Sequence, residues 1–158
     1  CCFTGHRRIP DYDATEIPNL LDMTVGCLLN EGYRYFVCGG ALGFDMLAAI
    51  AVLNLREELP GIHLILALPH FGHYQRWNKT DKAVFARILE RADRVLYLSK
   101  EYYPGCMQAR NRYMVDHSGY LIAFTWHAAS NSRELVEYAR RREEKGLIHV
   151  QNLADVVR

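Results

Sequence analysis

Short apolar runs alternate along this chain with longer segments in which apolar residues recur at every third or fourth position. The short runs have the length and composition of strands and lie at 1–4, 33–38, 62–68, 94–98, 120–125 and 147–150. The longer segments have the helical period and lie at 14–30, 44–58, 80–91, 106–117 and 132–145. This alternation is typical of strand–helix units repeated around a parallel sheet. We therefore predict an α/β fold: a single Rossmann-like, doubly wound, mainly parallel sheet of about six strands with helices on both faces.

The composition describes one globular domain, which we expect to span residues 1–158. Hydrophobic residues make up 50% of the chain, so it can form a full core without a metal or a disulfide. No apolar stretch approaches the roughly 20 residues that span a membrane, and we expect no membrane partner. The cysteines form no CxxC pair and follow no secretory signal, which favours reduced thiols and a cytoplasmic location. Because Cys1 already reads as part of a strand, we expect a few residues to precede it in the intact protein.

The run at 62–68 is apolar without interruption, as in strands that helices cover on both faces, so we expect it at the sheet centre. In an open doubly wound sheet, ligands bind outside the carboxyl ends of the strands, at the point where the strand order reverses. The residues that follow each strand are therefore the candidates for a functional site.

The first strand leads into Thr4, Gly5, His6 and Arg7, which bring a hydroxyl, an imidazole and a guanidinium together beside a glycine. Such a turn suits an anion, because arginine grips phosphate oxygens with its planar fork and the glycine allows close approach. The formal net charge is only +1, so any phosphate binding must be local. The alternative is a polar surface turn with solvated arginines.

The second strand ends in a glycine-rich turn with Gly39, Gly40 and Gly43, which opens directly into the helix at 44–58. The amides of a helix N-terminus favour negative charge there. The turn lacks the GK[ST] of a Walker loop, and no GxGxxG fingerprint occupies the first strand–helix turn. Asp45 lies in the first turn of that helix, where it is either a capping residue or a ribose-binding or catalytic carboxylate.

The loop after the third strand mixes aromatic and hydrogen-bonding side chains, among them Gln75 and Trp77, and can stack a base and read its edge. Trp77 also fits a packing role. His70 and His73 have no third ligand at a useful spacing, so we expect no metal site. On the helix at 106–117, Arg110 lies on the core side, which requires an internal carboxylate partner, a bound phosphate or a network at the strand ends.

Four fragments occur together in one order: Thr-Gly-His-Arg at 4–7, Gly-Gly-Ala-Leu-Gly-Phe-Asp at 39–45, the Gln75 and Trp77 pair, and the stretch 105–116. Together they resemble the SLOG superfamily of Rossmann-like proteins, named for the Smf/DNA-processing and Lonely Guy families, and within it the YpsA-like bacterial group. The resemblance extends over nearly the whole chain. It departs after the fifth strand, where relatives often carry Gly-Gly-Thr and this chain has Ser130, Asn131 and Ser132, which weakens one expected phosphate loop.

The resemblance implies a nucleotide or nucleotide-derived ligand, such as an ADP-ribose or NAD derivative, with phosphate at the first two glycine turns. No other cofactor is expected. The implied ligand-binding residues are Thr4, Gly5, His6, Arg7, Gly39, Gly40, Gly43, Asp45, Gln75, Trp77, Arg110 and Asn111. For Arg110 and Asn111, a structural role that links helix and loops is equally open.

Three functions remain open at this point. The first is binding, sensing or processing of the nucleotide-derived ligand in the cytosol. The second is N-glycosidic or phosphoribosyl hydrolysis of nucleoside monophosphates with Asp45 as the catalytic carboxylate, although the Gly-Gly-x-Gly-Thr-x-x-Glu signature of Lonely Guy enzymes is absent. The third is binding of single-stranded DNA, as in the related DNA-processing protein A, which the small net charge disfavours. Analogy with relatives that pair through helices also predicts a homo-oligomer.

Overall fold

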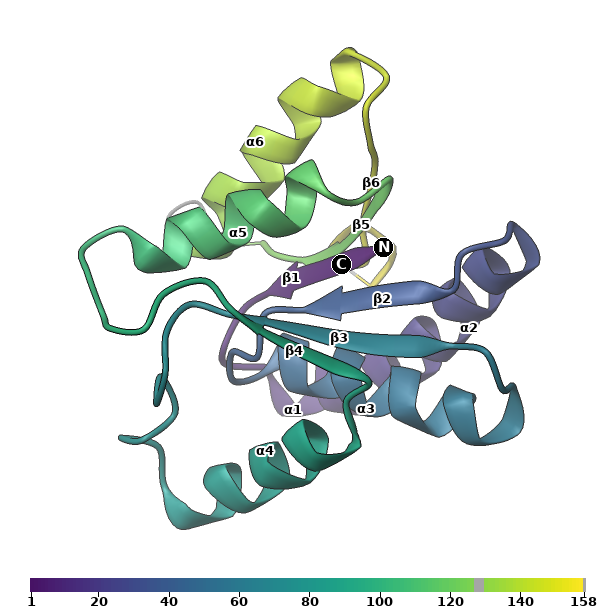
Figure 1. Ribbon diagram of the computed structural model, residues 1–158. Helices are drawn as coiled ribbons and strands as arrows, with labels where there is room; N and C mark the ends of the chain where they lie inside the picture. Colours follow the sequence, from purple (N-terminus) through teal and green to yellow (C-terminus); the bar gives the residue numbers. More distant parts are fainter. Residues whose placement is uncertain (127–129, 158) are drawn as a thin grey trace.

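The computed structural model describes residues 1–126 and 130–157 (Figure 1). Its strands are β1 (Cys2–Gly5), β2 (Tyr35–Cys38), β3 (His63–Leu68), β4 (Arg94–Tyr97), β5 (Tyr120–Phe124) and β6 (His149–Asn152). Its helices are α1 (Asp11–Ala14), α2 (Glu16–Asn30), α3 (Phe44–Glu58), α4 (Lys79–Arg91), α5 (Cys106–Asp116), α6 (Asn131–Glu144) and α7 (Ala154–Val157).

The six strands form one parallel sheet in the order β4-β3-β2-β1-β5-β6. The chain steps outward from β1 to β4 and then returns to place β5 on the other side of β1, in register with Thr4 opposite Ala123. The strand order therefore reverses between β1 and β5, and the predicted doubly wound α/β sheet is confirmed. The carboxyl ends of these two strands are the expected position for a ligand.

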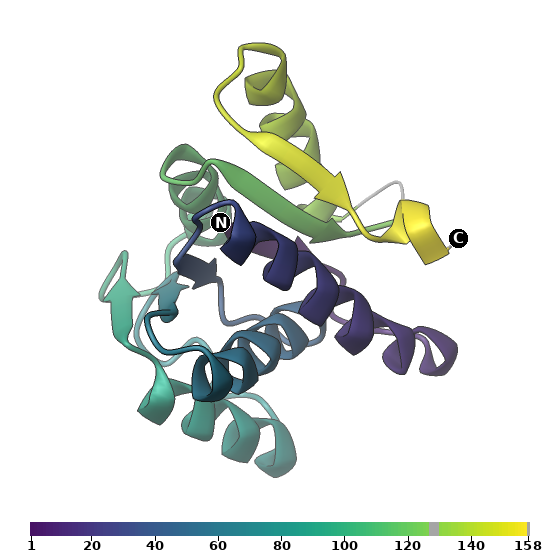
Figure 2. The same cartoon turned by 90° about the vertical axis from the view of Figure 1, so that its right-hand side faces the viewer.

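Helices α1 to α4 cover one face of the sheet and α5 and α6 cover the other (Figure 1). On the first face α2 and α3 lie side by side (Figure 2). Side chains alternate between the two cores along β1, because successive strand residues point to opposite faces. Phe3 packs in the core with α2, α3 and α4, and Cys2 packs in the core with α5 and α6. Helices on both faces of the sheet are thus confirmed.

The position of β3 differs from the prediction. Although its apolar run predicts the sheet centre, β3 lies between β2 and the edge strand β4. The run is apolar because α3 and α5 cover β3 from opposite faces, with Leu66 in one core and Ala67 in the other. Burial on both faces does not distinguish a central strand from the neighbour of a short edge strand.

Local chemistry explains the helix boundaries. The helix expected at 14–30 begins at Glu16 as α2, and the short helix α1 before it ends at Ala14, since Pro18 lacks an amide and its ring conflicts with the carbonyl of Ala14. Helix α4 begins where Asn78 accepts a hydrogen bond from the Asp81 amide at 2.8 Å. The last strand begins two residues later than predicted, because Leu147 is 52% exposed and is not part of the sheet.

Candidate functional site

A cavity of about 500 Å³ opens at the carboxyl ends of β1 and β5, where the strand order reverses. We call it the central cavity. Seven of the predicted site residues line it together: Thr4, Gly5, His6, Arg7, Asp45, Arg110 and Asn111. Arg8 and the first residues of α6, up to Ser132, complete its wall. Ser130, Asn131 and Ser132, where the sequence predicts a weakened phosphate loop, all line this cavity.

A second cavity of about 830 Å³ adjoins the first, and we call it the aromatic cavity. Gln75 and Trp77 line it. Its other walls include residues outside the predicted ligand-binding set, namely His70, Phe71, His73, Arg76, Lys100, Glu101 and Tyr102. Arg7, Ala41, Met107 and Arg110 line both cavities, so the two form one cleft along the carboxyl edge of the sheet.

His6 fixes the turn after β1. Its Nε2 accepts a hydrogen bond from the Trp126 amide at 2.9 Å, so Nδ1 carries the proton of the neutral ring and faces Ser132 Oγ at 3.5 Å. Arg7 and Arg8 follow, both exposed. In the part of the chain that the structure describes, neither forms an ion pair with a carboxylate. The turn therefore presents two exposed guanidiniums at the central cavity, and the Asp45 carboxyl group lines the same cavity.

The glycines of the second turn contact protein atoms and line neither cavity. A Cβ at Gly39 would lie 2.8 Å from Arg110 Nη1, and a Cβ at Gly40 would lie 2.6 Å from Leu68 Cδ2. At Gly43, where φ is +80°, a Cβ would collide with the backbone oxygen of Arg7. The close approach that these glycines allow is therefore an approach of one chain segment to another.

The start of α3 offers fewer free amides than the sequence predicts. The Phe44 amide donates to the His6 carbonyl at 3.1 Å, and the Met46 and Leu47 amides donate to the Gly43 carbonyl at 3.1 and 3.2 Å. The bond from Phe44 attaches the second turn to the first, and the bonds from Phe44 and Met46 satisfy donors that a helix N-terminus would otherwise offer to an anion.

Arg110 is 5% exposed, as its predicted position on the core side of α5 requires. Its Nη1 donates to the carbonyl of Gly39 and, at 3.5 Å, to that of Ala67, while its Nε donates to Asn111 Oδ1 at 2.8 Å. Arg110 thus ties the carboxyl ends of β2 and β3 to α5. With Oδ1 occupied, the Nδ2 donors of Asn111 remain for the central cavity that it lines.

Asp45 provides a carboxyl group at the floor of the central cavity and is 5% exposed. Burial raises its pKa to about 6, although the nearby guanidiniums of Arg110 and Arg7 and the Ala41 amide favour the ionised form. The Ala41 amide donates to Asp45 Oδ2 at 3.3 Å. Asp45 and Arg110 interact across Gly39, and burial in turn lowers the pKa of Arg110.

His73 connects the aromatic cavity to the second turn. Its Nε2 donates to the Gly40 carbonyl at 2.9 Å, and burial lowers its pKa to about 4, so the ring is neutral at physiological pH. Trp77 packs edge-on against His73 and Phe85, with ring centroids 5.4 and 5.3 Å apart. Trp77 therefore has the packing role that the sequence left open and also lines the cavity.

Residues 1–126 and 130–157 contain no group of three or more His, Cys, Asp or Glu side chains arranged to hold a metal ion. In the same ranges, no helix has the length and apolar character needed to cross a bilayer.

Comparisons with known proteins concern the family and the fold of this chain. The family model YpsA, described as the YspA SLOG family, matches residues 6–153. A UPF0398 protein of Staphylococcus epidermidis is 32% identical over 97 residues, which cover 60% of this chain and 52% of that protein. The uncharacterised SPbeta prophage-derived protein YoqJ of Bacillus subtilis is 30% identical over 134 residues, covering 77% and 78% of the two chains. This chain spans about half the length of the Staphylococcus relative.

Among solved structures, DNA processing protein A from Helicobacter pylori has the same fold, with a TM-score of 0.56. The match covers 96% of this chain and 74% of that one, at 20% sequence identity. That structure is described as giving insight into a single-stranded DNA binding mode. Because the family model extends from the turn after β1 to the end of β6, this chain belongs to the YpsA family of SLOG proteins.

Proposed function

We propose that this protein binds a nucleotide or nucleotide-derived ligand of the ADP-ribose or NAD type in the cleft formed by the central and aromatic cavities. The observation that carries the proposal is the convergence of Arg7 and Arg8 with the first turn of α6 in one cavity. Within the described chain neither guanidinium forms an ion pair with a carboxylate, and both suit phosphate oxygens.

The adjoining aromatic cavity supports a base at one end of the ligand. Trp77 and the exposed Tyr102 offer ring surfaces, while Gln75 and Glu101 offer donors and acceptors for the edge of a base. The volumes of the two cavities lie in the range of roughly 300–1,000 Å³ that is typical of small-molecule sites. A ligand with phosphates in the central cavity and its base beside Trp77 uses both.

Thermal unfolding with AMP, ADP-ribose and NAD tests the proposal. A ligand at 100 times its dissociation constant adds about 2.7 kcal/mol to the free energy of unfolding, so at least one of the three should raise the Tm. Arg7→Ala should abolish this increase, whereas Arg87→Ala on α4, outside the cleft, should leave it intact. A folded wild-type protein whose Tm does not respond to any of these compounds contradicts the proposal.

Hydrolysis of the ligand is a second candidate, favoured by the position and pKa of Asp45. A carboxyl group with a pKa of about 6 on a cavity floor is suited to act as a general base near neutral pH. We expect any release of free base from AMP to disappear in Asp45→Asn while AMP binding persists. Unchanged release by that variant would remove Asp45 from the reaction.

Single-stranded DNA is a third candidate. The small net charge disfavours nucleic acid, whereas the similarity to DNA processing protein A favours it. Exposed Phe71 and Tyr102 beside Arg76 and Lys100 form the combination of rings and cations that such strands contact. Fluorescence anisotropy with a labelled oligothymidine should then show affinity that falls steeply with salt. The absence of salt-sensitive binding would exclude this candidate.

A cytoplasmic, single-domain homo-oligomer remains part of the proposal, and analytical ultracentrifugation tests its oligomeric state.

A further inference from the structure

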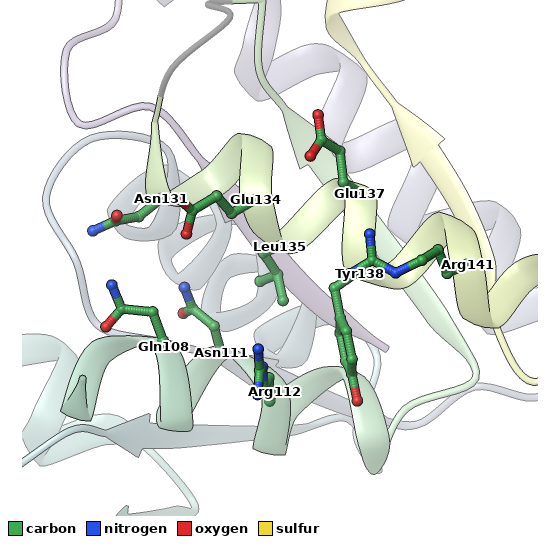
Figure 3. Close-up of a pocket in the computed structure, with 9 residues that line it drawn as sticks. All are labelled: Gln108, Asn111, Arg112, Asn131, Glu134, Leu135, Glu137, Tyr138 and Arg141. Atoms are coloured by element: carbon green, nitrogen blue, oxygen red, sulfur yellow. The ribbon is translucent and has the colours of Figure 1, made fainter.

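A third cavity of about 220 Å³ lies between α5 and α6 (Figure 3). We call it the interhelical cleft. Asn111 and Asn131 line both this cleft and the central cavity, so it extends the site away from the aromatic cavity. No residue of the interhelical cleft belongs to the aromatic cavity, which places the two at opposite ends of the site.

Two arginines mark the far end of the interhelical cleft. The guanidinium carbons of Arg112 and Arg141 lie 5.5 and 5.9 Å from the centre of the Tyr138 ring. Within the described residues, neither arginine forms an ion pair with a carboxylate. Glu137 belongs to the same cleft but pairs with Arg133 at 3.5 Å, and it points away from Tyr138 (Figure 3). This end of the cleft therefore has an excess of positive charge.

Neutral and acidic hydrogen-bonding groups gather at the near end, beside the central cavity. Figure 3 shows Gln108 from α5 facing Asn131 and Glu134 from α6. Together they offer amide donors and carboxylate acceptors, a set that suits the hydroxyl groups of a sugar, and acidic side chains bind ribose hydroxyls in other nucleotide sites. A sugar fits this end better than a second phosphate does, because Glu134 would repel an anion.

The length of the cleft limits what can reach its arginines. Tyr138 lies seven residues after Asn131 on α6, or about 10 Å along the helix axis. The two phosphates of a diphosphate share one bridging oxygen and cannot span that distance. A phosphate beside Arg112 and Arg141 must therefore be separated from the phosphate in the central cavity by a larger group, and the near end of the cleft suits a ribose.

We infer that the interhelical cleft binds a ribose phosphate at the end of the ligand opposite the base. The ribose lies against Gln108 and Glu134, and its phosphate lies between Arg112 and Arg141. This inference rests on the proposed nucleotide site and names its substrate class: nucleotides extended beyond the central phosphate by a phosphorylated ribose. The same chemistry occurs in a phosphorylated ADP-ribose and in a short oligoribonucleotide.

Isothermal titration calorimetry on two pairs of probes tests the inference and separates these sources. The first pair is ADP-ribose and ADP-ribose 1″-phosphate, and the second is the diribonucleotide ApA with and without a 3′-phosphate. We expect the terminal phosphate to lower the Kd by about tenfold in at least one pair, as one charge-assisted contact would. The pair that responds identifies the source of the ligand.

Arg112→Ala/Arg141→Ala should remove this gain and leave the Kd for ADP-ribose within about twofold of wild type. Both side chains are exposed, so the core stays intact. The matched control is Lys79→Ala/Arg87→Ala, which removes two exposed cations from α4 and should change neither Kd. In Glu134→Gln, the affinity for ADP-ribose should fall relative to that for ADP, because only ADP-ribose has the second sugar.

Three results overturn the inference. Equal Kd values within both pairs, with ADP-ribose still bound, would exclude the ribose phosphate subsite and leave the proposed nucleotide site standing. Retention of the gain in Arg112→Ala/Arg141→Ala would place the terminal phosphate elsewhere. Failure of AMP, ADP-ribose, NAD and both dinucleotides to bind at all would overturn the proposed function together with this inference.

Discussion

The first glycine turn, residues 5–8, presents two exposed arginines to the central cavity, whereas the second, residues 39–43, is packed against its neighbours and contributes only Ala41 to the cleft. Both follow parallel strands of the same sheet and end at the same edge. Their sequences suggest the same use, binding of phosphate. The two turns differ because the second packs against the backbone of the first, whereas the side chains of the first line the central cavity.

The contacts between the turns show how one depends on the other. The Phe44 amide donates to the His6 carbonyl, and Gly43 leaves room for the backbone oxygen of Arg7. His6 in turn holds the Trp126 amide. The second turn therefore acts as a support that sets the position of the first, and the exposed side chains of the first are left to contact a ligand. The following predictions test this division, from the largest expected effect to the smallest.

Loss of Arg110 should have the largest effect, because it holds the second turn through the Gly39 carbonyl. Arg110→Met leaves two carbonyls without a buried donor and leaves the Asp45 carboxylate without its nearest compensating charge. We expect the free energy of unfolding to fall by about 3–5 kcal/mol. Urea denaturation measures this, with Arg112→Met, an exposed arginine on the same helix, as the control. Equal losses in the two variants would show that Arg110 does not support the turn.

Gly43→Ala should be the next most damaging change. The new Cβ would meet the Arg7 backbone oxygen at a residue with a φ of +80°, so both strain and collision oppose folding. We expect a loss of at least about 3 kcal/mol. Gly146→Ala is the matched control, since Gly146 has a φ of +72° and open space around it, and should cost only about 1–2 kcal/mol. A Gly43→Ala protein as stable as Gly146→Ala would mean that the two turns do not pack as described.

The sequence predicts the fold more fully than it predicts the use of each turn. The bounds of α3 follow from the helical period of its apolar residues, and the position of β1 follows from a short apolar run. Neither prediction needs knowledge of distant residues. The placement of β3 next to the edge does not, because burial on both faces is common to several positions in a sheet.

The same distinction between local sequence patterns and contacts of distant residues applies to the site residues. Arg7 and Asp45 could be predicted as candidates because Arg7 lies in the turn after the first strand, Asp45 lies in the first turn of the helix after the second, and each carries a charge. The bonds from Arg110 to Gly39 and from His73 to Gly40 join residues 71 and 33 positions apart, and no local pattern encodes them. The interhelical cleft is equally invisible in the sequence, since it depends on how α5 packs on α6.

The stability contribution of Asp45 should change with pH in a direction set by its raised pKa. The folded protein binds this proton more tightly than the unfolded chain, because the pKa rises from 3.8 to about 6. The stabilisation is therefore complete below the unfolded pKa and is lost as the pH rises through the folded pKa. Relative to Asp45→Asn, the wild type should gain about 1 kcal/mol between about pH 7.5 and about pH 5.

Comparison with Asp45→Asn is essential, since His73 titrates in the opposite direction. Burial lowers the pKa of His73 from 6.5 to about 4, so its protonation destabilises the protein as the pH falls. Both proteins contain His73, and its contribution cancels in the difference. Chemical denaturation at several pH values gives the two curves, and parallel curves would mean that Asp45 is not buried as the second turn requires.

The smallest effect on stability should come from the two exposed arginines of the first turn. Arg7 and Arg8 are exposed and lack carboxylate partners in the described chain, so Arg7→Ala/Arg8→Ala should change the free energy of unfolding by less than about 0.5 kcal/mol. Gly5→Ala, in the same turn, should destabilise more, because its Cβ would lie 2.5 Å from Phe44 Cγ. A loss in the double variant as large as that of Gly43→Ala would erase the contrast between the turns. A stable double variant whose Tm no longer responds to AMP, ADP-ribose or NAD would assign ligand contact to the first turn and support to the second.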